Sequence, residues 1–212
     1  MIVRLQGGLG NQMFQYAYGR SRGAKFDKSG IVAPRTYALD PFRLPIEFSE
    51  DPATDIGYWQ SEKWFDHALI RKEFHAPDYA IEYIAVHVRL TDNLSARALA
   101  FHGNLLDTDY YKKAMVYMRE RVKDLRFLVF SDDAAWCQKN LNWPDVYIKS
   151  TYEPYADLLL MARCPYAIIA NSSFSWWGAW LGAQKIVVAP KRWFVVEVPG
   201  AEDIVPARWI KL

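Results

Sequence analysis

Cysteine is scarce in this chain, and long apolar runs are absent from it. Cys137 and Cys164 are the only cysteines among 212 residues. They lack the Cys-x-x-Cys or Cys/His spacing of zinc sites, so the sequence predicts two buried free thiols. No apolar stretch approaches the roughly 18 to 20 residues that span a membrane, and no secretion signal begins the chain. We therefore expect no transmembrane segment and a cytoplasmic protein, with peripheral membrane association left open.

An excess of charge of either sign is also lacking. Lysine and arginine total 26 against 24 for aspartate and glutamate, which gives a net charge of +2. A nucleic-acid partner normally needs a concentrated basic face, so none is expected. Hydrophobic residues make up 51% of the chain, which favours a globular protein over a disordered one. The sequence gives no indication of the oligomeric state.

Alternating strands and helices are the main pattern that is present. Short apolar runs predict buried parallel strands at residues 84–88, 127–130, 167–170 and 185–188. Helices are expected between them, and this β-α-β-α-β order predicts an open parallel sheet with helices on both faces. Ligands of such sheets bind at the carboxyl ends of the strands.

Two of the connecting helices can be placed. Residues 109–125 bring Met115, Met118, Val122 and Leu125 onto one face, with Thr108 or Asp109 available as the N-cap. A second helix is expected to begin at Pro154, because proline suits the first helical position.

A polar segment around residues 75–78 is the best candidate for a domain boundary. Pro77 disfavours helix in the residue before it, and apolar alternation resumes only at Ile84. We therefore expect a small domain over residues 1–78 and a larger one over residues 79–212.

The start of the chain has the pattern of a strand, a glycine-rich loop and a helix. The apolar residues 2–5 run into Gly7, Gly8 and Gly10, and a helical stretch with aromatic residues follows. Glycines allow a ligand to approach the backbone, and a helix amino terminus favours an anion. A tight turn without a ligand is the alternative, since glycine-rich loops also occur in proteins that bind nothing there.

The predicted strands of the larger domain end in groups that suit a nucleotide. Arg89 follows the first strand, residues 131–133 (Ser-Asp-Asp) follow the second, and residues 171–173 (Asn-Ser-Ser) follow the third. A guanidinium suits a pyrophosphate, a carboxylate suits a ribose or the N–H edge of guanine, and serines before a helix suit phosphate oxygens. Each group alone could equally be turn or N-cap chemistry.

Together these segments resemble a known family. The segments 7–17, 57–63, 87–89, 130–133 and 171–180, and the closing residues 206–210, are similar to those of the α-1,2-fucosyltransferases of glycosyltransferase family 11. The resemblance implies an α/β fold of the GT-B type, with two Rossmann-type lobes on parallel sheets. It also implies GDP-fucose as donor substrate, a galactoside glycan as acceptor, and no metal or other cofactor. The first lobe is shorter than is usual in the family, and it is the acceptor-side lobe.

The resemblance also implies roles for individual residues. Gly8 and Gly10, with Asn11, let the backbone approach the diphosphate, and Arg89 pairs with the β-phosphate. His87 and one of Asp132 or Asp133 read guanine. Ser172, Ser173 and Phe174 form a second phosphate clamp. As catalytic residues we expect Arg89 and, as a weak candidate for the general base, Asp92.

The chain departs from the family pattern at Leu90, where the family has a second arginine. Arg97 is a hypothetical replacement, and Leu90→Arg is expected to raise transfer. The triplet 107–109 (Asp-Thr-Asp) imitates a metal-binding motif of other glycosyltransferases, but its place before a helix favours N-capping.

The motif set favours an inverting α-1,2-fucosyltransferase. A relative that binds guanine nucleotide or glycan with weak or no turnover is the alternative, because Leu90 replaces an arginine and the first lobe is small. An unrelated oxidoreductase is disfavoured because the first loop lacks the Gly-x-Gly-x-x-Gly spacing.

Overall fold

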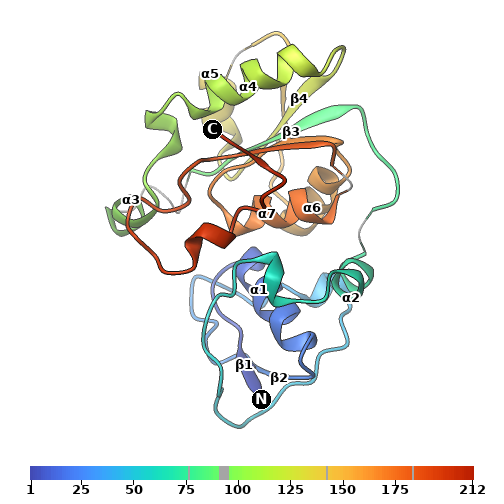
Figure 1. Cartoon of the computed structure of the whole chain (residues 1–212), viewed down its shortest axis with the longest axis vertical. Helices are drawn as coiled ribbons and strands as arrows, with labels where there is room; N and C mark the ends of the chain where they lie inside the picture. Colours follow the sequence, from blue (N-terminus) through green and yellow to red (C-terminus); the bar gives the residue numbers. More distant parts are fainter. Residues whose placement is uncertain (76, 91–95, 142, 183) are drawn as a thin grey trace. The chain divides into compact units, whose positions relative to one another are not determined.

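The computed structural model describes residues 1–75, 77–90, 96–141, 143–182 and 184–212 (Figure 1). The chain divides into two compact units, Met1–Ala76 and Pro77–Leu212. This division lies two residues before the boundary expected from the sequence.

The first unit is built on a single β-α-β element. Strand β1 (Ile2–Arg4) pairs in parallel with β2 (Lys25–Asp27), and helix α1 (Leu9–Arg20) connects them. Two 3-10 turns, η1 (Asp40–Phe42) and η2 (Glu62–Trp64), and helix α2 (His67–Glu73) complete the regular structure that is described in this unit. The unit is therefore an α/β lobe reduced to two strands, as the fold class expected from the sequence requires.

Helix α1 holds this small unit together. The rings of Tyr16 and Phe26 stack with their centroids 5.5 Å apart, and the Tyr16 hydroxyl donates a 2.6 Å hydrogen bond to Glu73 in α2. Met13 and Phe14 are also fully buried. A short helix in so small a unit is stabilised mainly by this burial of apolar side chains.

The second unit contains a six-stranded parallel sheet in the order β5-β4-β3-β6-β7-β8. The strands are β3 (Tyr83–Val88), β4 (Arg126–Ser131), β5 (Val146–Ile148), β6 (Tyr166–Ile168), β7 (Ile186–Ala189) and β8 (Ile210–Lys211). The helices are α3 (Ala96–His102), α4 (Tyr110–Arg121), α5 (Ala134–Asn140), α6 (Pro154–Ala162) and α7 (Ser173–Leu181), with 3-10 turns η4 (Leu105–Asp107) and η5 (Ala201–Asp203).

The two faces of this sheet are covered by different helices. Helices α4 and α5 lie over one face and α6 and α7 over the other (Figure 1). Alternation along β3 sends Val86 and Val88 into the core cluster that contains Met115 and Met118 of α4. His87 points to the opposite face, where its ring meets Phe174 of α7.

Most expectations for the strands, helices and cysteines of this unit are confirmed, but the end of one helix differs and two short strands were not predicted. All four predicted strands are present, α6 begins at Pro154, and Cys137 and Cys164 are buried free thiols. The helix predicted over residues 109–125 ends at Arg121, because Val122 is already extended and Asp124 has a φ of 62°. No pattern in the sequence predicts β5 and β8, which have three and two residues. Among the described residues, no helix combines the length and the hydropathy that crossing a membrane requires.

Candidate functional site

Arg89 and Asp132 lie just beyond the carboxyl ends of two neighbouring strands. Val88, the last residue of β3, is opposite Ser131, the last residue of β4. The residues that follow therefore meet: Arg89 Nη1 is 3.4 Å from Asp132 Oδ2, and both side chains are largely buried. The other oxygen, Asp132 Oδ1, accepts a 2.8 Å hydrogen bond from the Leu90 backbone N–H. Thus one carboxylate contacts both a guanidinium and the backbone beside it.

His87 is a neutral and fully enclosed imidazole. Its side chain is buried, and its ring centroid is 5.2 Å from that of Phe174. Burial, and secondarily the charge of Arg89, lowers the pKa of His87 to about 3, although Asp132 opposes the shift. Within the described part of the chain Nδ1 has no hydrogen-bond partner. A buried polar atom of this kind suits a ligand that can hydrogen-bond to it.

The first turn of α7 lies beside this imidazole. Ser172 occupies the N-cap position with an extended backbone, and its side chain makes no capping hydrogen bond. Ser172 and Ser173 are partly exposed, whereas Phe174 is buried. The first N–H groups of a helix have no partner within the helix and carry its positive dipole end. This turn therefore offers donors to an anion.

Two other residues of the predicted site have structural contacts. Asp133 is the N-cap of α5, where its carboxylate accepts a 2.9 Å hydrogen bond from the Trp136 N–H. The Asn171 side-chain amide donates to the carbonyl oxygens of His102, at 2.8 Å, and Trp193, at 3.2 Å. Asn171 thus connects the end of α3 to the segment after β7.

At this edge of the sheet the second unit brings together a guanidinium, a carboxylate, a neutral imidazole and a helix amino terminus. The residues are His87, Arg89, Asp132, Ser172, Ser173 and Phe174. A cationic group and helix N–H donors suit phosphate oxygens, and an imidazole with a free nitrogen suits a heterocyclic base. The arrangement can therefore bind a nucleotide with its phosphates on Arg89.

Gly8, Gly10 and Asn11 belong to the first unit, where the loop has the expected form. Gly7 has a φ of 75°, and a Cβ there would lie 2.6 Å from Asn11 Nδ2, so the position requires glycine. Gly8 is the N-cap of α1, and Arg35 Nη1 is 3.5 Å from where a Cβ on Gly8 would lie. A basic side chain thus borders the loop.

Buried amides hold this loop in place, which the sequence did not indicate. Gln12 Nε2 donates to the carbonyls of Gly7 and Thr36, at 2.9 and 2.8 Å. Gln15 accepts from the Gln6 N–H at 2.8 Å and donates to the Gly57 carbonyl at 3.1 Å. Glutamines inside a helix ordinarily face solvent. Only the burial of Gln12 and Gln15 in the structure shows that their side chains connect the loop to two distant segments.

Some predicted residues cannot be placed. Asp92 lies outside the described residues, as does the side chain of Arg97. In the triplet 107–109, Thr108 Oγ1 accepts a 3.2 Å hydrogen bond from the Tyr110 N–H at the start of α4. In the described portion of the chain, no three His, Cys, Asp or Glu side chains gather closely enough to hold a metal ion.

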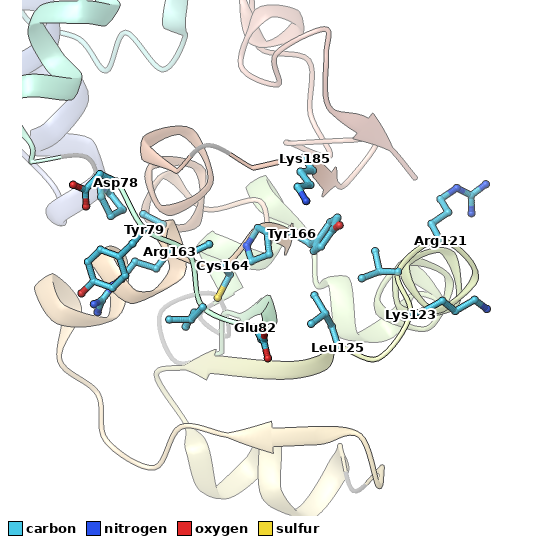
Figure 2. Close-up of a pocket in the computed structure, with 16 residues that line it drawn as sticks. Asp78, Tyr79, Glu82, Arg121, Lys123, Leu125, Arg163, Cys164, Tyr166 and Lys185 are labelled. Atoms are coloured by element: carbon cyan, nitrogen blue, oxygen red, sulfur yellow. The ribbon is translucent and has the colours of Figure 1, made fainter.

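A pocket of about 540 Å³ lies at the opposite, amino-terminal edge of the same sheet (Figure 2). Its lining includes Glu82, Leu125 and Lys185, each of which directly precedes a strand. None of the predicted site residues lines it. In Figure 2 the charged ends of Arg121 and Lys123 extend away from Cys164, so the basic side chains do not converge on one point.

Comparison with known proteins supplies the family context. The model described as glycosyl transferase family 11 matches residues 69–212. An α-1,2-colitosyltransferase of Escherichia coli is 29% identical over 288 positions, which cover 100% of this chain and 98% of that protein. Since the chain has 212 residues, at least 76 of those positions (288 less 212) have no counterpart in it.

Two further matches are less extensive. The O-antigen biosynthesis glycosyltransferase WbnK of Escherichia coli is 41% identical over 117 residues, which cover 52% of this chain and 38% of that protein. The chain thus matches little more than a third of that relative's length. A crystal structure of the α-1,6-fucosyltransferase NodZ, soaked with GDP-fucose, aligns with 85% of this chain and 91% of its own, at 16% identity and a TM-score of 0.45.

Proposed function

Because the chain belongs to glycosyltransferase family 11, we propose that it transfers L-fucose from GDP-β-L-fucose to the 2-hydroxyl of a terminal galactoside. The observation that carries this proposal is the meeting of His87, Arg89 and the start of α7 at the carboxyl edge of one parallel sheet. Bound nucleotides in open α/β sheets lie at that edge. The motifs shared with α-1,2-fucosyltransferases supply the sugar and the linkage.

Arg89 is the group that stabilises the leaving nucleotide in this proposal. The acceptor 2-hydroxyl attacks the anomeric carbon of fucose, the bond from that carbon to the phosphate oxygen breaks, and GDP leaves with its electron pair. Attack on the face opposite GDP inverts the β-linked donor to an α-linked product. A guanidinium can form two parallel hydrogen bonds to a phosphate and neutralise the charge that grows on it. The hydroxyl proton passes to a general base, for which Asp92 remains the candidate.

Residues at the same edge of the sheet are assigned to the guanine base and to the second phosphate contact. Nδ1 of His87, which remains neutral at ordinary pH, hydrogen-bonds guanine. The N–H groups of the first turn of α7, with Ser172 and Ser173, face the diphosphate. Asp132 is favoured over Asp133 as the guanine-reading carboxylate, because its contacts are with Arg89 and Leu90 at the end of β3, whereas Asp133 caps α5.

The first unit keeps the roles that the resemblance implies. Gly8, Gly10 and Asn11 are assigned to diphosphate binding from the resemblance alone, and Gln12 and Gln15 hold their loop in place. The unit as a whole is the acceptor-side lobe of a GT-B-type enzyme that needs no metal.

Two observations favour alternatives to this proposal, one with a different donor sugar and one without efficient turnover. The relative that is aligned along the whole chain is named for colitose, a sugar that differs from fucose by lacking the 3-hydroxyl. Leu90, which stands where the family has arginine, favours a protein that binds guanine nucleotide with weak or no turnover.

A donor comparison tests the proposal. Calorimetry with GDP establishes nucleotide binding, and transfer is then measured with GDP-fucose and GDP-colitose on lactose and N-acetyllactosamine. Product from GDP-fucose, with an α-1,2 linkage by NMR, supports the proposal. Product from GDP-colitose alone identifies the other sugar, and GDP binding without product supports the non-catalytic alternative. Failure to bind GDP contradicts all three.

A further inference from the structure

Helix α4 begins with two tyrosines whose hydroxyls reach the ends of strands. Tyr110 and Tyr111 are both buried. The Tyr110 hydroxyl donates a 2.6 Å hydrogen bond to the carbonyl of Ile169, just after β6. The Tyr111 hydroxyl donates a 2.9 Å hydrogen bond to the carbonyl of His87 in β3. One helix thus contacts the backbone at two of the strand ends that carry the candidate site.

The hydrogen bond of Tyr111 lies within the segment that carries His87 and Arg89, the two side chains assigned to guanine and phosphate. His87 lies in β3, and Arg89 directly follows the strand, with Val88 between them. The Tyr111 hydroxyl thus contacts the backbone two residues before Arg89. On the next residue the Leu90 N–H is held by Asp132. Side chains therefore hold the backbone where β3 leaves the sheet.

We propose that Tyr111 is a positioning residue for the transfer reaction, because its hydroxyl fixes the backbone from which His87 and Arg89 reach the nucleotide. This inference rests on the proposed function. Tyr111 itself lies in the core cluster beneath the other face of the sheet and acts through these two residues.

The hydroxyl has no role in packing that would explain its presence there. The ring lies among apolar side chains such as Val86 and Met115, which a phenylalanine would contact equally well. A hydroxyl in such a place costs free energy unless it is hydrogen-bonded. Burial, and secondarily Cys137, raises the pKa of Tyr111, so the phenol remains a donor across the ordinary pH range.

The variant Tyr111→Phe removes the hydroxyl and keeps the ring. We expect GDP affinity and kcat/KM to fall about three- to tenfold, the change that corresponds to one lost hydrogen bond. Tyr16→Phe is the matched control, because Tyr16 is also buried and its hydroxyl donates to Glu73 in the first unit. Both variants should lower the thermal midpoint, but only Tyr111→Phe should lower GDP affinity.

A double-mutant cycle tests whether Tyr111 acts through His87 and Arg89. In a background that carries both His87→Gln and Arg89→Ala, Tyr111→Phe should lower GDP affinity much less than in the wild type. Wild-type GDP affinity in Tyr111→Phe would overturn the inference, as would an equal loss in both backgrounds or an equal loss in Tyr16→Phe. A wild-type chain that binds no GDP would instead overturn the proposed function and this inference with it.

Discussion

The backbone N–H of Leu90 donates a hydrogen bond to Asp132, while the Leu90 side chain packs into the core cluster with Val88 and Met115. The same carboxylate lies 3.4 Å from Arg89. The chain therefore turns after β3 so that position 89 faces the site and position 90 faces the core. An arginine at position 90 would place its guanidinium among apolar side chains.

Leu90→Arg is thus expected to destabilise the protein, contrary to the expectation from the sequence that it would raise transfer. Leu90 is only 2% exposed, and a buried, unpaired charge costs several kcal/mol. Thermal unfolding measures the effect, with Leu90→Met as the control that retains volume and apolarity. A thermal midpoint in Leu90→Arg equal to that of Leu90→Met, together with increased transfer, would contradict this prediction.

Arg89→Ala should abolish measurable transfer and weaken GDP binding while leaving guanosine binding nearly unchanged. The reason is that the guanidinium is assigned to the phosphates, and a hydrogen bond to a charged group is worth about 1.5 to 3 kcal/mol, or roughly one to two orders of magnitude in affinity. Calorimetry with both ligands makes the comparison. Arg119→Ala is the control, because Arg119 pairs with Asp145 on the same unit away from the site. Equal losses for GDP and guanosine would argue against phosphate binding by Arg89.

The stability of the protein should fall with acidification in a way that depends on His87. Its pKa is about 3 in the folded protein and about 6.5 when unfolded, so the unfolded chain binds more protons between these values. The free energy of unfolding therefore decreases as pH falls through this window, by about 2 kcal/mol at pH 5 from this group alone. Denaturant unfolding at pH 7 and pH 5 should show a smaller decrease in His87→Gln than in wild type. Identical decreases would show that His87 is not the group responsible.

Substitutions of the adjacent residues Asp132 and Asp133 should have different effects, on nucleotide preference and on stability respectively. Asp133→Ala removes the N-cap of α5 and should cost about 1 kcal/mol of stability, whereas Asp133→Asn keeps a capping oxygen and should cost less. Asp132→Asn should instead reduce the preference for GDP over ADP, measured by calorimetry. If Asp133→Asn reduces that preference and Asp132→Asn does not, the guanine-reading role belongs to Asp133.

The sequence was most informative where regular spacing and parallel strands decide the structure. Apolar runs located β3, β4, β6 and β7, and strand direction alone placed Arg89 and Asp132 at one edge. The ends of helices were predicted less well. Helix α4 ends where Val122 becomes extended, and nothing in the amphipathic pattern marks that point.

Contacts between distant segments could not be predicted in the same way. A tyrosine at position 111 in an apolar helix face is typical of a core residue, and its bond to the His87 carbonyl depends on how α4 docks on the sheet. Gln12 and Gln15 are similar, since only the folded chain shows which carbonyls their amides reach. Leu90 is the reverse case: the departure from the family pattern was evident, but its burial reversed the expected effect of restoring arginine.

Helix α7 presents its first turn to the site and anchors its remainder with indole rings. Trp176 is fully buried, donates a 2.6 Å hydrogen bond to the Ile204 carbonyl, and packs against Trp209. Ile204 and Trp209, about thirty positions downstream, therefore help to position Ser172 and Ser173. Removing the segment after η5 would therefore disturb the proposed phosphate binding at a distance, without deleting any residue assigned to the nucleotide.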